Sequence, residues 1–278
     1  MPEGLSAPRS EDRARSSGDR LLAVLALFTV DQPQWTVEAA ASRLGVSATT
    51  TYRYFKRLTK AGLITPVTGA GYMLGPAIIQ MYRQIQITDP MLRAGRAIMV
   101  DLLQHAPDGS TAILCRLFHD RVICVLQVTG LGPQPPVSYE NGRPMPLYRG
   151  ATSKIILAHL PTRALKTLFA HDAATIAETA LGPGWEDFRR NLLAIRRVGT
   201  CVARGEIDPG RVGVAAPIFD ADRAVLGSLS LALAASRADP PTVAQLTPLV
   251  AAGAREIERS MTDKSAFKPS PARFKIAR

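Results

Sequence analysis

The sequence predicts an α+β protein in which a winged helix-turn-helix is followed by a larger domain, an antiparallel sheet flanked by helices. Residues 36–74 have the pattern helix, tight turn, helix and short β-hairpin. Beyond residue 110, two β-rich runs precede amphipathic helices, and three more β-rich runs precede a final helix, an order typical of α+β domains. The length of 278 residues is sufficient for one small and one ordinary domain.

Composition narrows the class of protein further. A formal net charge of +11 favours a polyanionic partner. Cys115, Cys124 and Cys201 are widely spaced and lack a C-x-x-C pattern, which argues against a disulfide framework and a metal site. No apolar run is long enough to span a membrane, and the first residues lack the apolar core of a signal peptide. We therefore expect a cytoplasmic protein without metal, cofactor or membrane partner, associated with the nucleoid when it is bound to DNA.

The first part begins with a helix near Asp19, whose inward side chains we expect to be Leu21, Leu22, Leu25 and Phe28. The next helix follows Thr36, whose hydroxyl is suited to cap it. Gly45 ends that helix, because the chain must turn there with a positive φ.

Ser47 is suited to cap the third helix, on which Thr51, Tyr54, Phe55 and Leu58 share the inward side. The outward side is rich in hydroxyl and basic groups, which reach base edges and phosphates in the major groove. A small helical subdomain without a nucleic-acid role is the alternative, but the conjunction of turn, polar face and terminal hairpin argues against it. The predicted DNA-binding residues are Ser47, Thr49, Thr50, Tyr52, Arg53, Lys56, Arg57 and Tyr72.

The predicted domains are a disordered arm at 1–18, the winged helix-turn-helix at 19–75, a linker helix at 76–90, the larger domain at 91–261 and a basic disordered tail at 262–278. Within the larger domain we expect a hairpin at 111–128 around a His119-Asp120 turn, then a long Gly- and Pro-rich loop at 130–150 without secondary structure. Helices are expected at 91–105, 151–159, 164–170, 185–198 and 242–261, and strands at 200–203, 212–218 and 225–233.

Across residues 19–261 the chain resembles the IclR family of bacterial transcriptional regulators. The matching motifs in the first part are Gly45-Val46-Ser47 through Arg53 and Leu58, Ala61-Gly62-Leu63 and Tyr72-x-Leu74-Gly75. Those in the second part are Pro146-Leu147, Ala151-Thr152-Ser153-Lys154, Leu157-Ala158, Glu206, Pro209-Gly210, Val214 through Asp220, and Leu229-Ser230. The resemblance implies a GAF-like effector-binding domain, a homodimer or homotetramer, and transcription controlled by a small metabolite.

The chain departs from the family pattern at Tyr52, at Tyr148-Arg149, at Ser153 and at Gly213, where many members carry His, His, Gly and Cys respectively. Three of these four changes fall at the expected pocket. The identity of the effector therefore cannot be carried over from other members.

The expected pocket combines the start of the helix at Ala151 with the strand that bears Ser228 and Ser230. Helix N-terminal amides, hydroxyls and a guanidinium suit a carboxylate, and the two serines point to one face of the strand. Tyr139 and Tyr148 favour an aromatic acid, whereas solvated loop arginines and structural serines are the alternative interpretation. The predicted effector-binding residues are Arg143, Tyr148, Arg149, Gly150, Ala151, Thr152, Ser153, Gly213, Ser228 and Ser230.

The expected partners are therefore double-stranded DNA with a roughly palindromic operator, a small organic-acid effector, a second or further copies of the chain, and RNA polymerase if the protein is an activator. Two alternatives remain: an enzyme that uses Cys115 or Cys124 as nucleophile, and an architectural DNA-binding protein that senses nothing. Both cysteines lie in apolar strand runs without a partner base at a recognisable spacing.

Overall fold

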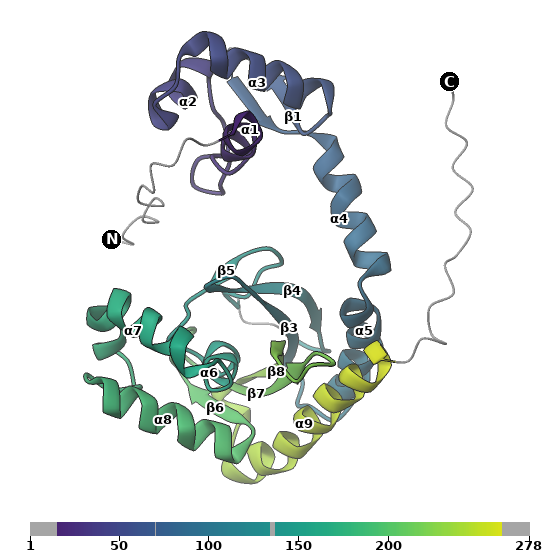
Figure 1. Cartoon of the computed structure of the whole chain (residues 1–278). Coiled ribbons are helices and arrows are strands. Elements are labelled where there is room, and N and C mark those ends of the chain that lie inside the picture. The colour runs from purple at the N-terminus through teal and green to yellow at the C-terminus, as the bar shows by residue number, and fades with distance from the viewer. Residues whose placement is uncertain (1–15, 70, 134–136, 263–278) are drawn as a thin grey trace. The chain divides into compact units, whose positions relative to one another are not determined.

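The computed structural model describes residues 16–69, 71–133 and 137–262 (Figure 1). Contacts divide the chain into two compact units, with the boundary between Ile87 and Thr88. Most of the predicted arm, and all of the predicted tail except Thr262, lie outside the described residues. Among the described helices, none is long and apolar enough to cross a membrane.

The first unit is a winged helix-turn-helix followed by a helix that ends at the unit boundary. Its elements are α1 (Ser17–Leu25), α2 (Val37–Leu44), α3 (Ala48–Lys60), β1 (Ile64–Val67), β2 (Gly71–Leu74) and α4 (Pro76–Thr88). The predicted caps are confirmed: the Thr36 hydroxyl accepts from the Ala39 amide at 3.2 Å, and the Ser47 hydroxyl accepts from the Thr50 amide at 3.2 Å. Gly45 ends α2 with φ of 66°, in the left-handed region that favours glycine.

The core of this unit lies between α1, α2, α3 and the hairpin. The prediction for α3 is confirmed, because Thr51, Tyr54, Phe55 and Leu58 are all buried. The prediction for Leu22 is wrong: its side chain is 62% exposed, whereas Val24 is buried. Leu21, Val24 and Leu25 follow the i, i+3, i+4 spacing of one face of α1, from which Leu22 is rotated away, and Phe28 packs on this face from beyond the end of the helix.

The second unit is built on a six-stranded antiparallel sheet with the order β5-β4-β3-β8-β7-β6. Its strands are β3 (Thr111–Phe118), β4 (Arg121–Thr129), β5 (Pro144–Met145), β6 (Cys201–Arg204), β7 (Arg211–Phe219) and β8 (Val225–Ala234). Its helices are α5 (Pro90–Gln104), α6 (Ala151–Leu157), α7 (Thr162–Ala177), α8 (Trp185–Val198), the 3-10 turn η1 (Ala235–Arg237) and α9 (Pro240–Thr262).

Helices cover both faces of this sheet (Figure 1). On one face, α5 and α9 pack against Leu229, Leu231 and Leu233 of β8. On the other face lies α6, where the alternate β8 residues Ser228 and Ser230 hydrogen-bond to Thr152. The alternation of leucine and small polar residues along β8 therefore assigns its two sides to different layers.

Two sequence predictions for this unit need correction. The Gly- and Pro-rich segment after β4 is not wholly without secondary structure, because Pro144 and Met145 pair with Ile123 and Val122 as β5. The helix predicted at 164–170 is longer and runs to Ala177, with a kink at Asp172. The alanine-rich continuation has ordinary helical propensity, and the kink is where Asp172 accepts a hydrogen bond from the Tyr148 hydroxyl at 2.7 Å.

The imidazole of His159 provides a pH-dependent contribution to the stability of this unit. Burial, and then the charges of Arg196 and Arg223, lower the pKa of His159 from 6.5 to about 4. Its ring lies edge-on against Phe219, with 4.9 Å between ring centroids. As the pH falls through 6.5, the unfolded chain binds a proton that the folded protein does not bind until about pH 4, so stability is lost across this window.

Between pH 7 and pH 5 the parent protein should lose up to about 2 kcal/mol of stability through His159, and His159→Phe should not show this part of the loss. Urea-denaturation midpoints at the two pH values measure this effect. His171→Gln, which replaces an exposed histidine of α7, is the control. An equally steep loss of stability in His159→Phe and in the parent protein would show that another group causes it.

Candidate functional site

The exposed surface of α3 carries most of the residues predicted to bind DNA. Ser47, Thr49, Tyr52, Arg53, Lys56 and Arg57 are all exposed. Thr50 is half-buried, and its hydroxyl accepts from the Ser47 hydroxyl at 2.9 Å. The sequence LGVSATTTYRYFKRL therefore folds into a helix with an apolar inner side and a basic, hydroxyl-bearing outer side.

Tyr72 of the wing packs inward against α3 and is only partly exposed. Its ring is edge-on to Phe55 with 4.9 Å between centroids, and its backbone pairs with Trp35 in a short bridge. A groove of about 480 Å³ runs between α3 and the wing, and Thr49, Tyr52 and Tyr72 are among its lining residues. All eight residues predicted to bind DNA belong to this one compact unit, and their role in DNA binding stays a prediction.

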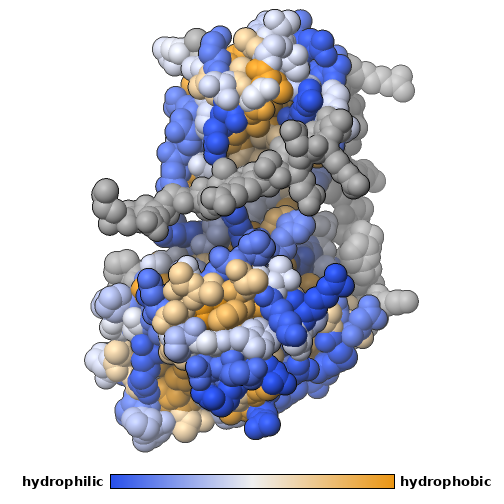
Figure 2. Space-filling model, turned by 60° about the vertical axis from the view of Figure 1, so that its left-hand side comes forward, coloured by the Kyte–Doolittle hydropathy of each residue, from blue (hydrophilic) through white to orange (hydrophobic). Residues whose placement is uncertain are grey.

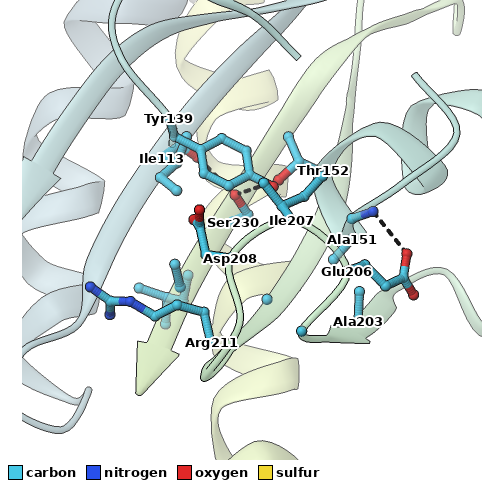
Figure 3. A pocket seen from close by; sticks show the side chains of 15 residues that line it. Ile113, Tyr139, Ala151, Thr152, Ala203, Glu206, Ile207, Asp208, Arg211 and Ser230 are labelled. Atoms are coloured by element: carbon cyan, nitrogen blue, oxygen red, sulfur yellow. Dashed lines mark hydrogen bonds between the residues drawn. The ribbon is translucent and has the colours of Figure 1, made fainter. Parts of the chain in front are cut away.

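The second unit contains a small cavity between the start of α6, the sheet and the β6–β7 connection (Figure 3). We call it the α6 cavity. Its volume is about 30 Å³. Its lining residues are Ile113, Tyr139, Gly150, Ala151, Thr152, Ala203, Gly205, Glu206, Ile207, Asp208, Arg211, Gly213, Ser230, Leu231 and Ala232.

A chain of hydroxyl groups crosses the α6 cavity. The Thr152 hydroxyl donates to the Ser230 hydroxyl at 3.1 Å, and Ser230 donates to the carbonyl of Ile113 at 3.4 Å. Tyr139 lines the same cavity, where the side chain of Thr152 lowers the pKa of the phenol by less than burial raises it. Burial raises the pKa of Tyr139 well above its ordinary value, so its phenol stays neutral and remains a donor at physiological pH.

Two carboxylates from the β6–β7 connection border the same cavity. Glu206 accepts from the Gly150 amide at 2.9 Å and from the Lys154 ammonium at 2.5 Å. Asp208 accepts from the Ser138 amide at 3.1 Å and also from the Ser138 hydroxyl. The amide of Gly150, the N-cap residue of α6, is therefore bonded to a carboxylate of the protein itself.

Gly150 allows the close approach of chain segments at this point. Its φ is 80°, and a Cβ atom there would lie 2.8 Å from Ile207 Cγ1 and 3.0 Å from the Tyr139 hydroxyl. A residue other than glycine would therefore be strained and would push the two lining side chains apart.

The structure brings only half of the predicted effector-binding residues to the α6 cavity: Gly150, Ala151, Thr152, Gly213 and Ser230. Ser228 points to the same side of β8 as Ser230, but its hydroxyl donates to the Thr152 carbonyl at 3.2 Å and does not line the cavity. Ser153 is also buried outside the lining.

The three residues predicted at the mouth lie elsewhere. Tyr148 is buried, with its hydroxyl on Asp172 and its ring near Phe188. Arg149 extends toward Glu178, with 3.9 Å between the guanidinium and the carboxylate. Arg143 lines a depression of about 430 Å³ that adjoins the α6 cavity and shares Asp208 and Arg211 with it. The role of all ten residues in ligand binding stays a prediction.

Glu206 was noted in the sequence only as a match to a family motif, and Ile207, Asp208 and Arg211 were not noted at all, although all four line the cavity. The available signal was the E-x-D sequence between glycines in a connection that joins two strands of one sheet. Among the described residues, no group of three or more histidine, cysteine and acidic side chains is arranged to hold a metal ion.

An apolar groove lies between the β3–β4 turn and the start of α7. Its volume is about 460 Å³, and its apolar lining residues are Leu117, Leu147, Leu160, Pro161, Ala164 and Leu168. Figure 2 brings the α7 side of the second unit forward and shows that apolar side chains gather there among polar ones.

The fold and its surfaces define a class of protein: a DNA-binding protein with a winged helix-turn-helix and a second, α+β domain that contains a polar cavity. The model of the IclR helix-turn-helix domain matches residues 17–67, and the model of the bacterial transcriptional regulator IclR C-terminal domain matches residues 90–259. The chain belongs to the IclR family of bacterial transcriptional regulators. The predicted family and fold class are thereby confirmed.

Individual relatives agree with this assignment. The HTH-type transcriptional regulator KipR of Bacillus subtilis is 23% identical over 241 residues, which cover 86% of this chain and 94% of KipR. The crystal structure of an IclR transcriptional regulator from Alicyclobacillus acidocaldarius has a TM-score of 0.73 at 23% identity and covers 90% of this chain and 100% of its own. An IclR homologue from Microbacterium hydrocarbonoxydans, crystallised with 4-hydroxybenzoate, has a TM-score of 0.66 at 20% identity and covers 88% of this chain and 99% of its own.

Proposed function

We propose that this transcriptional regulator binds a small organic acid in the α6 cavity and that the bound acid controls its affinity for operator DNA. The observation that carries the proposal is the hydrogen-bonded pair of hydroxyls on Thr152 and Ser230, which lines a cavity at the start of α6 together with the Tyr139 phenol. Buried hydroxyl groups of this kind recognise a polar ligand group at fixed positions. The 4-hydroxybenzoate bound by the Microbacterium homologue supports an aromatic acid as the class of effector.

The polar groups of the cavity suit a ligand with two different ends. The hydroxyls of Tyr139, Thr152 and Ser230 can rotate to donate to a carboxylate, and such charge-assisted bonds are the stronger kind. The Asp208 carboxylate, which Figure 3 shows beneath the Tyr139 ring, offers an acceptor for a ligand hydroxyl. A hydroxylated acid therefore satisfies both ends, whereas a second carboxylate would be repelled by Asp208.

The size of the cavity requires that its lining move when an aromatic acid binds. A cavity of roughly 150 Å³ is known to hold a benzene molecule, and the α6 cavity measures about 30 Å³. Ile207 covers it from a connection bounded by Gly205 and Gly210, both with positive φ. We propose that this connection moves outward on binding, which gives the acid different affinities for two states of the domain and hence a means of regulation.

The DNA partner is proposed to be a roughly palindromic operator read by at least two copies of the chain. One helix-turn-helix reads few base pairs, and paired heads read half-sites about one helical turn, or a multiple of it, apart. Helix α4 supports self-association, because none of its residues is buried and Ile79, Ile85 and Ile87 are each more than half exposed. If the protein activates transcription, RNA polymerase is a further proposed partner.

Two serines of β8 provide a matched test of the cavity. Ser230→Ala removes a hydroxyl that lines the cavity, and we expect it to weaken binding of the acid about tenfold or more. Ser228→Ala removes a hydroxyl of the same strand face outside the cavity, and the affinity for the acid should remain within about threefold. Thermal-shift screening of hydroxybenzoates and small hydroxy acids identifies the ligand, and calorimetry measures both variants.

The outcomes separate the proposed function from its alternatives. If neither variant changes the affinity for an acid that binds, the site lies elsewhere. If no acid raises the unfolding temperature, the protein is better described as an architectural DNA-binding protein. Turnover of a bound acid would support an enzyme instead.

A further inference from the structure

Two of the three cysteines face each other across the β3–β4 hairpin. Cys115 and Cys124 are register partners in this antiparallel pair, and both are buried free thiols. Cys201 lies on β6, at the other edge of the sheet. Burial in apolar strands explains why each cysteine is tolerated, but it does not require that the two lie directly opposite each other.

The hydrogen-bond pattern fixes the geometry of the pair. The Cys124 amide donates to the Arg143 carbonyl at 3.4 Å, and the Cys124 carbonyl accepts from the Gly142 amide at 2.7 Å. Both backbone groups of Cys124 therefore point away from β3, which is the arrangement of a non-hydrogen-bonded pair. In such pairs the Cα atoms lie about 4.5 Å apart and the side chains approach closely, within the roughly 4.4–6.8 Å range that a disulfide spans.

Both side chains belong to one cluster of buried residues on the α6 side of the sheet. Burial raises the pKa of Cys115, whereas the side chain of Cys115 lowers the pKa of Cys124. Cys124 is thus the more acidic thiol, and its Sγ lies 3.7 Å from Oδ1 of Asn141, an exposed residue of the segment that covers it.

We propose that Cys115 and Cys124 form a reversible thiol–disulfide site that is oxidised by hydrogen peroxide or another hydroperoxide. The Cys124 thiolate attacks one peroxide oxygen: an S–O bond forms, the O–O bond breaks, and water or an alcohol leaves after it takes up a proton. The Cys115 thiol then attacks the Cys124 sulfur of this sulfenic acid, the S–S bond forms, and the S–O bond breaks with release of water. Two thiols are oxidised by two electrons in total, and one peroxide is reduced.

The position of the pair connects it to the α6 cavity. Cys115 is two residues from Ile113 on the same strand face, and both belong to the cluster of buried side chains that includes Tyr139 and Ala151. A disulfide would tie β3 to β4 two residues away from Ile113, which lines the cavity. The oxidation state of the pair therefore adds a second input to the same domain, independent of the identity of the acid.

The test is made on the folded, full-length protein. After treatment with hydrogen peroxide, free thiols are alkylated, the chain is unfolded and digested, and peptides are mapped by mass spectrometry. We expect a Cys115–Cys124 cross-link in the parent protein and in the control Cys201→Ser, and its loss after reduction with dithiothreitol. The unfolding temperature should rise by about 5 °C on oxidation, because the link restricts the unfolded chain. Cys115→Ser should show neither change.

Three results would overturn the proposal. The first is that both thiols stay reduced under excess peroxide while the protein is folded. The second is that Cys124 is overoxidised to sulfinic acid while Cys115 remains a thiol. The third is a cross-link that involves Cys201. A disulfide that forms without any rise in unfolding temperature would overturn the inference that it ties the hairpin.

Discussion

Replacement of Lys154 by methionine is expected to destabilise the second unit by about 3 kcal/mol. The Lys154 ammonium is bonded to Glu206 at 2.5 Å, and only 7% and 23% of the two side chains are exposed. Removal of one partner of such a pair leaves the other charge poorly solvated, which is the costly way to break a buried ion pair. Here the cost is near the lower end of the known range, because Glu206 keeps the Gly150 amide and some contact with solvent.

Urea denaturation of a Trp35→Phe background isolates this effect, because Trp185 of α8 is then the only tryptophan of the chain and reports on the second unit. Arg190→Met removes the basic partner of the exposed pair Arg190–Asp187 and should cost less than about 0.5 kcal/mol. The double variant Lys154→Met/Glu206→Gln should recover part of the loss, because no uncompensated charge remains. If Lys154→Met and Arg190→Met are equally mild, the pair does not hold the β6–β7 connection to α6.

Replacement of Arg53 by alanine is expected to weaken operator binding by about 1–3 kcal/mol, or roughly 5- to 150-fold. Arg53 is exposed on α3, one helical turn beyond Thr49 and Thr50. At that position a guanidinium reaches either a guanine edge or a phosphate. Arg53→Lys distinguishes the two, because lysine keeps the charge for a phosphate but loses the bidentate geometry that recognises guanine.

An operator obtained by in vitro selection allows the three proteins to be titrated at two salt concentrations. Arg237→Ala, which removes the same charge from an exposed site in the second unit, is the control and should bind almost as tightly as the parent. If Arg53→Ala folds normally and binds the operator as tightly as the control does, Arg53 has no role in DNA recognition.

The winged helix-turn-helix was predictable from sequence because its determinants are local. Thr36 and Ser47 cap the two helices within three residues of their own positions, and Gly45 ends α2 through its own φ. The inward and outward sides of α3 follow from helical periodicity alone. The error in α1, at Leu22, arose because the buried face of this helix centres on Val24, and Leu22 lies two residues, or about 200°, around the helix from it.

The α6 cavity was only partly predictable because it depends on non-local packing. Periodicity placed Ser228 and Ser230 on one side of β8, but only packing against α6 determines that Ser230 alone reaches the cavity. Gly150 turns the chain with a positive φ, so Tyr148 and Arg149 leave in another direction. Glu206 reaches the start of α6 from 56 residues away in sequence, and no local pattern reveals such a contact.

The register of the cysteine pair, in contrast, was encoded locally. A two-residue turn at His119-Asp120 pairs Phe118 with Arg121, and counting outward from it pairs Cys115 with Cys124. The bulge in the ladder falls between Leu114 and Cys115, just beyond the pair, and so leaves this register intact.

The central claim is that an acid in the α6 cavity changes the affinity of the protein for DNA. Fluorescence anisotropy of the selected operator, titrated with protein at several concentrations of the acid that best stabilises the fold, tests this claim most directly. We predict that saturating acid shifts the apparent dissociation constant for DNA at least about fivefold. In Ser230→Ala the same shift should require about tenfold more acid, whereas binding to DNA without acid should be unchanged. An acid that binds the protein tightly and leaves its operator affinity unchanged would contradict the account.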